Sequence, residues 1–378
     1  MKFKFWYTAI VAIALLLNGA AAFGLAKPYP AATAAVLMDF TTGQILYEKN
    51  ADERRAPAST TKIMTALIAL ERGELGQKVI ASSYASKVGG SSIWLSPGES
   101  HRLEEMLYGV LLSSGNDASV AVAEALAGSE SKFASWMTAK ANALGAQNTN
   151  FENSSGLPAP RHYSTARDLA VMTRYALHNS TFDRIVRTKR KTMGWPGHKY
   201  DRLMVNHNKL LWRYDFADGV KTGYTREAGK CLVASATRND HRLIAVVLNS
   251  KEMYEDCQAL FDYGFNNYQL LTVASAGEAV RVIPVIDGVA EKVPVLPNRP
   301  VTLVVPKTAA DQVNLNVELP VSLEAPVERM QRVGQLEVKI GPKLVEKIPL
   351  VAAAPVPKEG FWKRLLGWFR GLLPLGGH

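Results

Sequence analysis

The sequence places a serine and a lysine three residues apart, Ser59 and Lys62, at the start of a helical pattern. On a helix, residues i and i+3 share a face, so the hydroxyl and the amine can touch. A serine hydroxyl is a weak nucleophile until a neighbouring base takes its proton, and a desolvated lysine amine can be that base. Backbone N–H groups at a helix N-terminus also favour developing negative charge. The pair therefore indicates a nucleophile for acyl transfer.

The spacing alone does not identify a site, because Ser129 and Lys132 repeat it. We interpret this second pair as a helix N-cap followed by a surface lysine. The first pair differs because two further polar motifs accompany it. Ser114 and Asn116 lie in a break between two helical patterns, and the only Lys-Thr-Gly of the chain, at residues 221–223, lies on a predicted strand.

The three motifs occur in the order Ser-x-x-Lys, Ser-x-Asn and Lys-Thr-Gly, which resembles the signature of penicillin-binding proteins and serine β-lactamases. The middle motif is Ser-Gly-Asn here, against Ser-Asp-Asn in some relatives. Longer segments resemble one branch of this superfamily, the low-molecular-mass D-alanyl-D-alanine carboxypeptidases. The resemblance covers nearly the whole chain after residue 26. These segments are residues 57–66, 91–98, 153–157, 162–168 and 218–223.

This resemblance implies four catalytic residues. Ser59 would be the acyl-ester nucleophile and Lys62 its proton acceptor, while Ser114 and Asn116 would relay protons and hold the substrate amide. The implied reaction removes the terminal D-alanine from peptidoglycan stem pentapeptides. Penicillins and other β-lactams would acylate the same serine, and no cofactor or metal is expected.

The resemblance also implies a substrate-binding strand, consisting of Lys221, Thr222, Gly223 and Tyr224. Lys221 and Thr222 would engage the terminal carboxylate, which requires a cation and hydroxyl groups. The N–H groups of Ser59 and Tyr224 would form the oxyanion hole. An exposed strand of this kind can pair with an extended peptide along its edge.

The patterns around the motifs predict an α+β fold. Between residues 34 and 265, strands are predicted near both ends and helices between them. This order indicates an antiparallel sheet whose strands come from distant parts of the sequence. Ser129 and Thr165 are predicted N-caps and Gly145 a C-cap. We predict a hairpin over residues 34–48, helices over 103–112, 117–126, 132–144, 166–177 and 252–265, and strands over 219–225, 231–236 and 243–248.

The chain divides into four predicted segments. Residues 1–26 read as a signal peptide cleaved near 22–26, because lysines precede an apolar run and small residues follow it. The alternative is an uncleaved anchor, although the run is shorter than the roughly 20 residues that span a bilayer. Residues 27–270 would form the catalytic domain, and residues 271–352 a small β-rich domain. Residues 353–378 would be a linker and an amphipathic helix.

The predicted C-terminal helix, residues 360–378, carries its large apolar side chains on one face, and its only charges are Lys363, Arg364 and Arg370. This pattern is typical of a helix that lies in a membrane interface. The alternative is a helix docked on the protein core. We therefore expect an exported protein attached peripherally to the outer face of the cytoplasmic membrane.

Composition restricts the remaining possibilities. The net charge of +10 favours anionic surfaces, but no Lys/Arg run interleaved with aromatic residues supports nucleic-acid binding. Cys231 and Cys257 are too few for a metal cluster, and either a disulfide or two buried thiols is compatible with the sequence.

The sequence also bears on three other functions. A class A β-lactamase needs a glutamate that activates water, and the sequence contains no Glu-x-x-Asn. A transpeptidase differs only in its acceptor and stays open. A wall-binding scaffold with decayed sites conflicts with the intact Ser59, Lys62, Ser114, Asn116 and Lys221.

Overall fold

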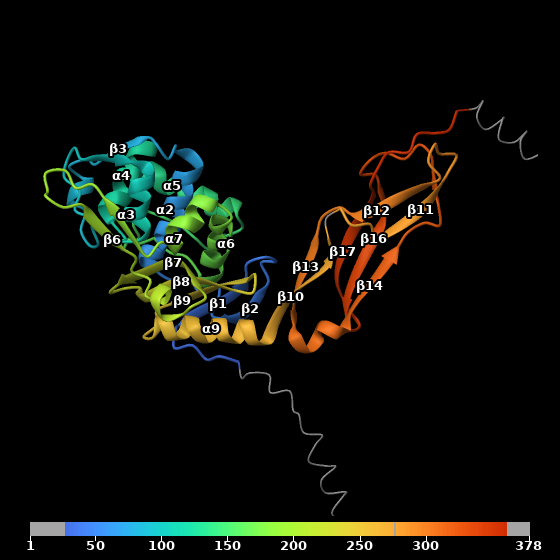
Figure 1. The fold of residues 1–378 in the computed structure, drawn as a ribbon. Helices are drawn as coiled ribbons and strands as arrows, with labels where there is room; N and C mark the ends of the chain where they lie inside the picture. The colour runs from blue at the N-terminus through green and yellow to red at the C-terminus, as the bar shows by residue number, and fades with distance from the viewer. Residues whose placement is uncertain (1–26, 276, 361–378) are drawn as a thin grey trace, which may run out of the picture.

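A computed structural model describes residues 27–275 and 277–360 (Figure 1). The predicted signal peptide and the predicted anchor helix, apart from Gly360, lie outside the described residues. Within the described part of the chain, no helix combines the length and the apolar character needed to cross a membrane.

The catalytic domain is built on a five-stranded antiparallel sheet in the order β2-β1-β9-β8-β7. Ala34 of the first strand pairs with Leu248 of the last, so the sheet joins the two ends of the domain, as predicted. The fold class is therefore α+β, which confirms the prediction. The strands are β1 (Ala34–Asp39), β2 (Ile45–Lys49), β7 (Ala217–Thr225), β8 (Gly229–Arg238) and β9 (His241–Leu248).

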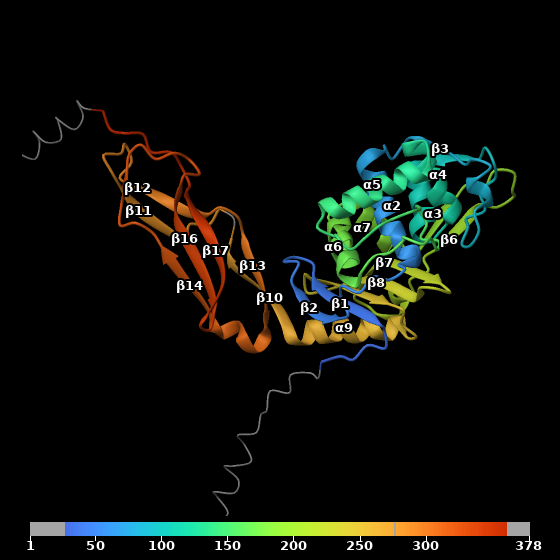
Figure 2. The same ribbon diagram turned by 180° about the vertical axis from the view of Figure 1, so that it is seen from behind.

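Helices cover both faces of this sheet (Figures 1 and 2). On one face, Val233 and Ile244 of the sheet belong to the same core cluster as Leu67 of α2. On the other face, Leu232 and Leu243 pack in a cluster with α9. The helices are α2 (Lys62–Arg72), α3 (Leu103–Leu111), α4 (Asn116–Ala127), α5 (Glu130–Ala143), α6 (Ala166–Leu177), α7 (Ser180–Arg187), α8 (Leu210–Arg213) and α9 (Met253–Asn267).

The predicted helix caps are confirmed. Ser129 Oγ accepts a hydrogen bond from Lys132 N at 3.3 Å, and Thr165 Oγ1 accepts one from Asp168 N at 3.0 Å. Gly145 follows the end of α5 with φ +87°, a conformation that favours glycine. The second Ser-x-x-Lys is thus a helix N-cap.

Short elements complete the domain and were not predicted, since strands of three or four residues carry too little periodicity. They include the turn η1 (Ala58–Thr61), which leads directly into α2, and the turn η2 (Ala85–Lys87). The remaining pairs are β3 (Lys78–Ile80) with β4 (Ser100–Arg102), and β5 (Arg190–Met193) with β6 (Arg202–Val205).

The second domain consists of strands and one 3-10 turn, with its own core of buried side chains such as Val295, Leu336 and Ile348. Its larger sheet has the order β14-β16-β17-β12-β11-β15, and β10 pairs separately with β13. The elements are β10 (Tyr268–Ala274), β11 (Arg281–Ile286), β12 (Lys292–Pro297), β13 (Val301–Pro306), η3 (Lys307–Gln312), β14 (Val313–Glu318), β15 (Leu323–Glu324), β16 (Arg332–Ile340) and β17 (Lys343–Ala352).

Helix α9 runs into β10, where the second domain begins (Figure 1). Val304 of β13 belongs to the core cluster beneath the catalytic sheet, and Lys307 Nζ donates to Phe265 O at 2.9 Å. At the other end, residues 353–358 differ from the free linker that we predicted. Val356 is almost fully buried and exchanges two backbone hydrogen bonds with Val327, because an apolar residue there completes the β-rich core.

Cys231 and Cys257 are buried free thiols. They belong to different core clusters, on opposite faces of the catalytic sheet. The structure therefore selects the free-thiol alternative.

Candidate active site

Ser59 and Lys62 meet where η1 passes into α2. Ser59 lies on the 3-10 turn and Lys62 is the first residue of the helix. Lys62 Nζ is 3.0 Å from Ser59 Oγ, so the pairing expected from the spacing is present. Ser59 is half-buried, whereas the side chain of Lys62 is fully buried. A partly accessible hydroxyl thus faces an amine shielded from water.

Two further oxygens orient this amine. Lys62 Nζ lies 2.7 Å from Asn116 Oδ1 and 2.7 Å from Ser155 O. Burial holds the pKa of Lys62 well below its usual value, and the nearby Lys221 ammonium lowers it further. The neutral amine is the form that can accept the Ser59 proton.

The Ser-x-Asn motif lies at the start of α4. Asn116 is its first residue, and Asn116 Nδ2 donates to Gly89 O at 2.6 Å. Ser114 is buried with φ +61°, an uncommon conformation for a residue other than glycine. The structure therefore brings Asn116 to Lys62. Among the described residues, no hydrogen bond joins the Ser114 hydroxyl to Lys62.

The Lys-Thr-Gly motif lies on β7, the outer strand of the sheet. This strand packs against η1 so closely that a Cβ on Gly223 would come 3.0 Å from Ser59 N. Tyr224, the next residue, is exposed and Thr222 is half-buried. The predicted oxyanion donors are the N–H groups of Ser59 and Tyr224. They therefore lie where the backbone of β7 comes closest to the backbone of η1.

Lys221 is the second buried amine of the site. Its Nζ donates to Thr222 O at 2.9 Å, and its side chain is almost fully buried. Burial lowers the pKa of Lys221 to about 7. Its charge is therefore poised to change near neutral pH.

The loop at residues 153–157 contributes to the site through its backbone, which motif reading missed. Ser155 O contacts Lys62, and Gly156 adopts φ +84° so close to Ala58 O that a Cβ would meet it at 1.9 Å. Glu130 Oε1 accepts hydrogen bonds from Ser154 N and Oγ, which anchors the loop to α5. The Asn-Ser-Ser-Gly sequence signals a tight turn, but nothing in it reveals the partner of a carbonyl.

His162 is a second residue whose place was not predicted. Glu152 N donates to His162 Nδ1 at 3.1 Å, so the ring proton sits on Nε2 and points to Thr61 Oγ1, 2.8 Å away. Burial lowers the pKa of His162 to about 4. The neutral ring of His162 thus fixes the side chain of Thr61, the residue immediately before Lys62, through a hydrogen bond.

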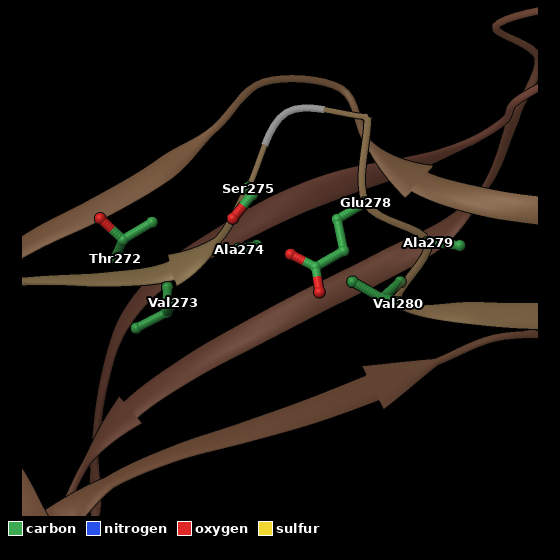
Figure 3. Close-up of a pocket in the computed structure, with 7 residues that line it drawn as sticks. All are labelled: Thr272, Val273, Ala274, Ser275, Glu278, Ala279 and Val280. Atoms are coloured by element: carbon green, nitrogen blue, oxygen red, sulfur yellow. The ribbon is translucent and has the colours of Figure 1, made fainter.

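A cavity in the second domain does not combine a serine with a lysine or histidine. A cavity of about 190 Å³ in the β-rich domain, between β10 and β11, is lined by Ser275 and Glu278 but by no lysine or histidine (Figure 3). Within the described residues, no cluster of three or more His, Cys, Asp or Glu side chains could hold a metal ion.

Comparisons with known proteins agree with this geometry. A family profile described as D-alanyl-D-alanine carboxypeptidase (peptidase S11) matches residues 22–252. A second profile, described as the C-terminal domain of penicillin-binding protein 5, matches residues 268–358. The chain is 36% identical to D-alanyl-D-alanine carboxypeptidase DacF of Bacillus subtilis, over 89% of each chain. It is 32% identical to DacA of Escherichia coli, over 89% of this chain and 86% of the relative.

Solved structures lead to the same family. Penicillin-binding protein 5 from Haemophilus influenzae is 30% identical and superposes with a TM-score of 0.77, over 88% of this chain and 100% of the other. The Streptomyces K15 DD-transpeptidase (R248L mutant) is 36% identical with a TM-score of 0.61, over 64% of this chain and 100% of the other. The chain therefore belongs to the D-alanyl-D-alanine carboxypeptidases, a family of serine peptidases that includes penicillin-binding proteins.

Proposed function

We propose that Ser59 is the nucleophile of this carboxypeptidase and Lys62 its base. The 3.0 Å separation of Ser59 Oγ and Lys62 Nζ, with the amine fully buried, carries the proposal. Ser59 Oγ attacks the carbonyl of the penultimate D-alanine while its proton passes to the neutral amine. The C–N bond breaks, and the terminal D-alanine leaves with that proton. Water then hydrolyses the ester, restoring the serine and leaving a peptide one residue shorter.

The same proposal assigns the substrate-binding groups. Lys221 and Thr222 bind the terminal carboxylate, and the N–H groups of Ser59 and Tyr224 stabilise the oxyanion. The close approach of Gly223 to Ser59 N supports this pairing of donors. Asn116 holds the substrate amide, and Ser114, two residues before it in the chain, returns the proton to the leaving amine.

The proposed substrate is the stem pentapeptide of peptidoglycan. We expect mass spectrometry to show the loss of one alanine from the pentapeptide. Ser59→Ala should abolish both this cleavage and labelling by a fluorescent penicillin. The matched control is Ser129→Ala, which removes the serine of the other Ser-x-x-Lys and should leave both activities intact. Inactivation by Ser129→Ala with an active Ser59→Ala enzyme would overturn the assignment.

The likeness to a DD-transpeptidase supports a second candidate activity. In that reaction an amine replaces water in the step that releases the acyl-enzyme. Adding glycine or isotope-labelled D-alanine as acceptor to the pentapeptide assay tests it. A product in which the acceptor has replaced the terminal residue would establish transpeptidation, whereas the shortened peptide alone would establish hydrolysis.

We also propose the domain organisation and the site of action. Residues 1–26 direct export, residues 27–270 form the catalytic domain, and a β-rich domain follows. Residues 360–378 attach the protein to the outer face of the cytoplasmic membrane. The profile match that begins at residue 268 supports the boundary between the two folded domains, and the apolar and basic composition of the tail supports the attachment.

A further inference from the structure

An exposed tryptophan stands close to the proposed active site. Trp94 is 71% exposed, whereas Ile93 and Leu95 on either side of it are buried. Its backbone has φ +62°, a conformation that is rare for a bulky residue. Such strain persists only where the surrounding structure imposes it, and it concentrates at functional sites.

A buried carboxylate imposes this conformation. Asp117, the residue after Asn116, accepts hydrogen bonds from Ile93 N and Leu95 N at 3.1 Å and from Ser92 Oγ at 2.6 Å. Ser92 Oγ also accepts a hydrogen bond from Trp94 N at 2.8 Å. The two backbone groups that flank the indole are therefore fixed to the start of α4.

The opposite side of the loop is held by the β5–β6 hairpin. Arg202 is buried, donates to Trp94 O at 3.2 Å and to Glu99 Oε1 at 2.9 Å, and places its guanidinium 5.0 Å from the centre of the Trp195 ring. Trp195 stacks on His198 with ring centres 4.0 Å apart. One guanidinium thus joins the Trp94 loop to the second tryptophan.

We call the side chains of Trp94, Trp195, His198 and Tyr200 the aromatic patch. Trp195 is half-buried and the other three are exposed. The hairpin that bears three of them lies at the end of the catalytic domain away from the β-rich domain (Figures 1 and 2).

The segment that carries Trp94 begins beside Asn116, one of the proposed catalytic residues. Ser91 O accepts a hydrogen bond from Asn116 N at 2.7 Å, and Trp94 is only three residues further along the chain. Three residues span at most about 11 Å. The four stem-peptide residues before the cleaved bond span up to about 14 Å when extended. The two spans are similar, so a stem peptide that runs from Ser59 toward Ser91 would carry the group at its other end toward the indole.

In peptidoglycan, that other end is joined to an amino sugar of the glycan strand. A sugar ring presents a face of C–H groups and a rim of hydroxyls, so it suits a flat aromatic ring with polar neighbours. Trp94 has such a neighbour in Ser96, which is exposed two residues further along the chain. A protein partner would require a contiguous apolar surface instead.

We propose that the aromatic patch is a subsite for the glycan strand, with an amino-sugar ring stacked on Trp94. The proposal rests on the proposed function, because it places the remainder of that substrate. The subsite would make the enzyme prefer stem peptides that are still attached to their disaccharide over free peptides.

The test compares kcat/KM for the free pentapeptide with kcat/KM for the same peptide attached to its N-acetylglucosamine–N-acetylmuramic acid disaccharide. We expect wild type to favour the disaccharide form by roughly tenfold, as for one well-placed aromatic contact. Trp94→Ala should abolish this preference without changing the rate on the free peptide, and Trp94→Phe should keep most of it. Tyr29→Ala is the matched control, since Tyr29 is an exposed aromatic residue beside Lys49 of β2, at the far edge of the sheet.

An equal preference in wild type and Trp94→Ala, or no preference in wild type, would overturn the proposal. An equal loss on both substrates in Trp94→Ala would also overturn it, because the residue would then serve the peptide. Failure of the proposed function is distinguishable, since wild type would then cleave neither substrate.

Discussion

Two buried lysines define the chemistry at the residue scale. In the proposed mechanism, Lys62 must be neutral to accept a proton, whereas Lys221 must be charged to bind a carboxylate. Burial lowers the pKa of both amines, and the charge on Lys221 lowers the pKa of Lys62 further. Burial therefore favours the neutral form of Lys62, and the charge on Lys221 adds to this effect.

This arrangement predicts a pH dependence. As pH rises through about 7, Lys221 loses its proton and with it the cation that binds the substrate carboxylate. We expect kcat/KM for the pentapeptide, which reports ionisations of the free enzyme, to fall above about pH 7, by up to roughly tenfold per pH unit. Initial rates between pH 5 and 9 measure this limb.

Two controls identify the group responsible. A substrate with an amidated C-terminus should react slowly but without the decline, because it offers no carboxylate. Lys221→Arg should also remove the decline, because a guanidinium stays charged throughout this range. An unchanged decline in Lys221→Arg would assign the limb to a different group.

Residue types and spacing predicted which side chains meet here, because Ser59, Lys62, Asn116 and the strand at 221–224 all lie in recognisable motifs. They did not predict the Ser155 carbonyl, since every residue has one and only the path of the loop selects its partner. Nor did they predict the neutral His162, whose pKa is lowered by burial and whose tautomer depends on a hydrogen bond from Glu152 N.

At the scale of elements, the active site depends on how closely β7 approaches η1. Gly223 permits that approach, because any side chain there would press on Pro57 O and Ser59 N. The proposed oxyanion donors, Ser59 N and Tyr224 N, belong to η1 and β7 respectively. The distance between the two N–H groups is therefore set by how closely β7 packs against η1.

Gly223→Ala should therefore slow acylation by a fluorescent penicillin by about 10²–10³-fold, the usual effect of losing one oxyanion donor. The matched control is Gly76→Ala, because a Cβ at Gly76 meets nothing within 4 Å. Circular dichroism of both variants should match wild type. A Gly223→Ala enzyme that is acylated at the wild-type rate would show that the close approach is unimportant.

Elements with a strong local signal were predicted well. The turn between β8 and β9 contains Asn239 and Asp240, both of which have positive φ, as suits a sharp turn between the two predicted strands. The short strands β3 to β6 were missed, because their pairing is decided by tertiary contacts rather than by pattern. Residues 353–358 resemble a linker in composition. They are nevertheless held by isolated β-bridges from Val356 to Val327 and from Lys358 to Gly288.

At the scale of the whole molecule, the folded part is two domains joined through α9 and β10. Lys307 and Val304 tie the β-rich domain to α9 on the face of the sheet opposite α2. The proposed membrane segment follows the β-rich domain, so attachment and catalysis belong to separate parts of the chain.

Deleting residues 360–378 should release the protein from membranes and leave pentapeptide cleavage unchanged. Burial of five or more large apolar side chains stabilises the attachment by roughly 1.5–3 kcal/mol each before ordering costs. Three positive charges add on the order of 1 kcal/mol each on anionic lipid. Sedimentation with vesicles measures both contributions.

A variant with Lys363, Arg364 and Arg370 changed to Gln is the matched control. It should lose the salt-sensitive part of binding and keep the apolar part. If the truncated protein still sediments with vesicles, attachment depends on another segment, and an uncleaved N-terminus is the first to examine.

The strand order also determines when the enzyme can exist. β1 pairs with β9 across more than 200 residues, and Asp256 of α9 accepts hydrogen bonds from Ala31 N and Ala32 N. A chain that emerges N-terminus first presents Ser59 long before the strand that carries Lys221. Such long-range pairing folds slowly, and the sheet cannot close until residue 248 has emerged. During the proposed export, the proposed nucleophile is therefore present without its oxyanion donors, so we expect the emerging chain to be inert toward both substrate and penicillin until it folds.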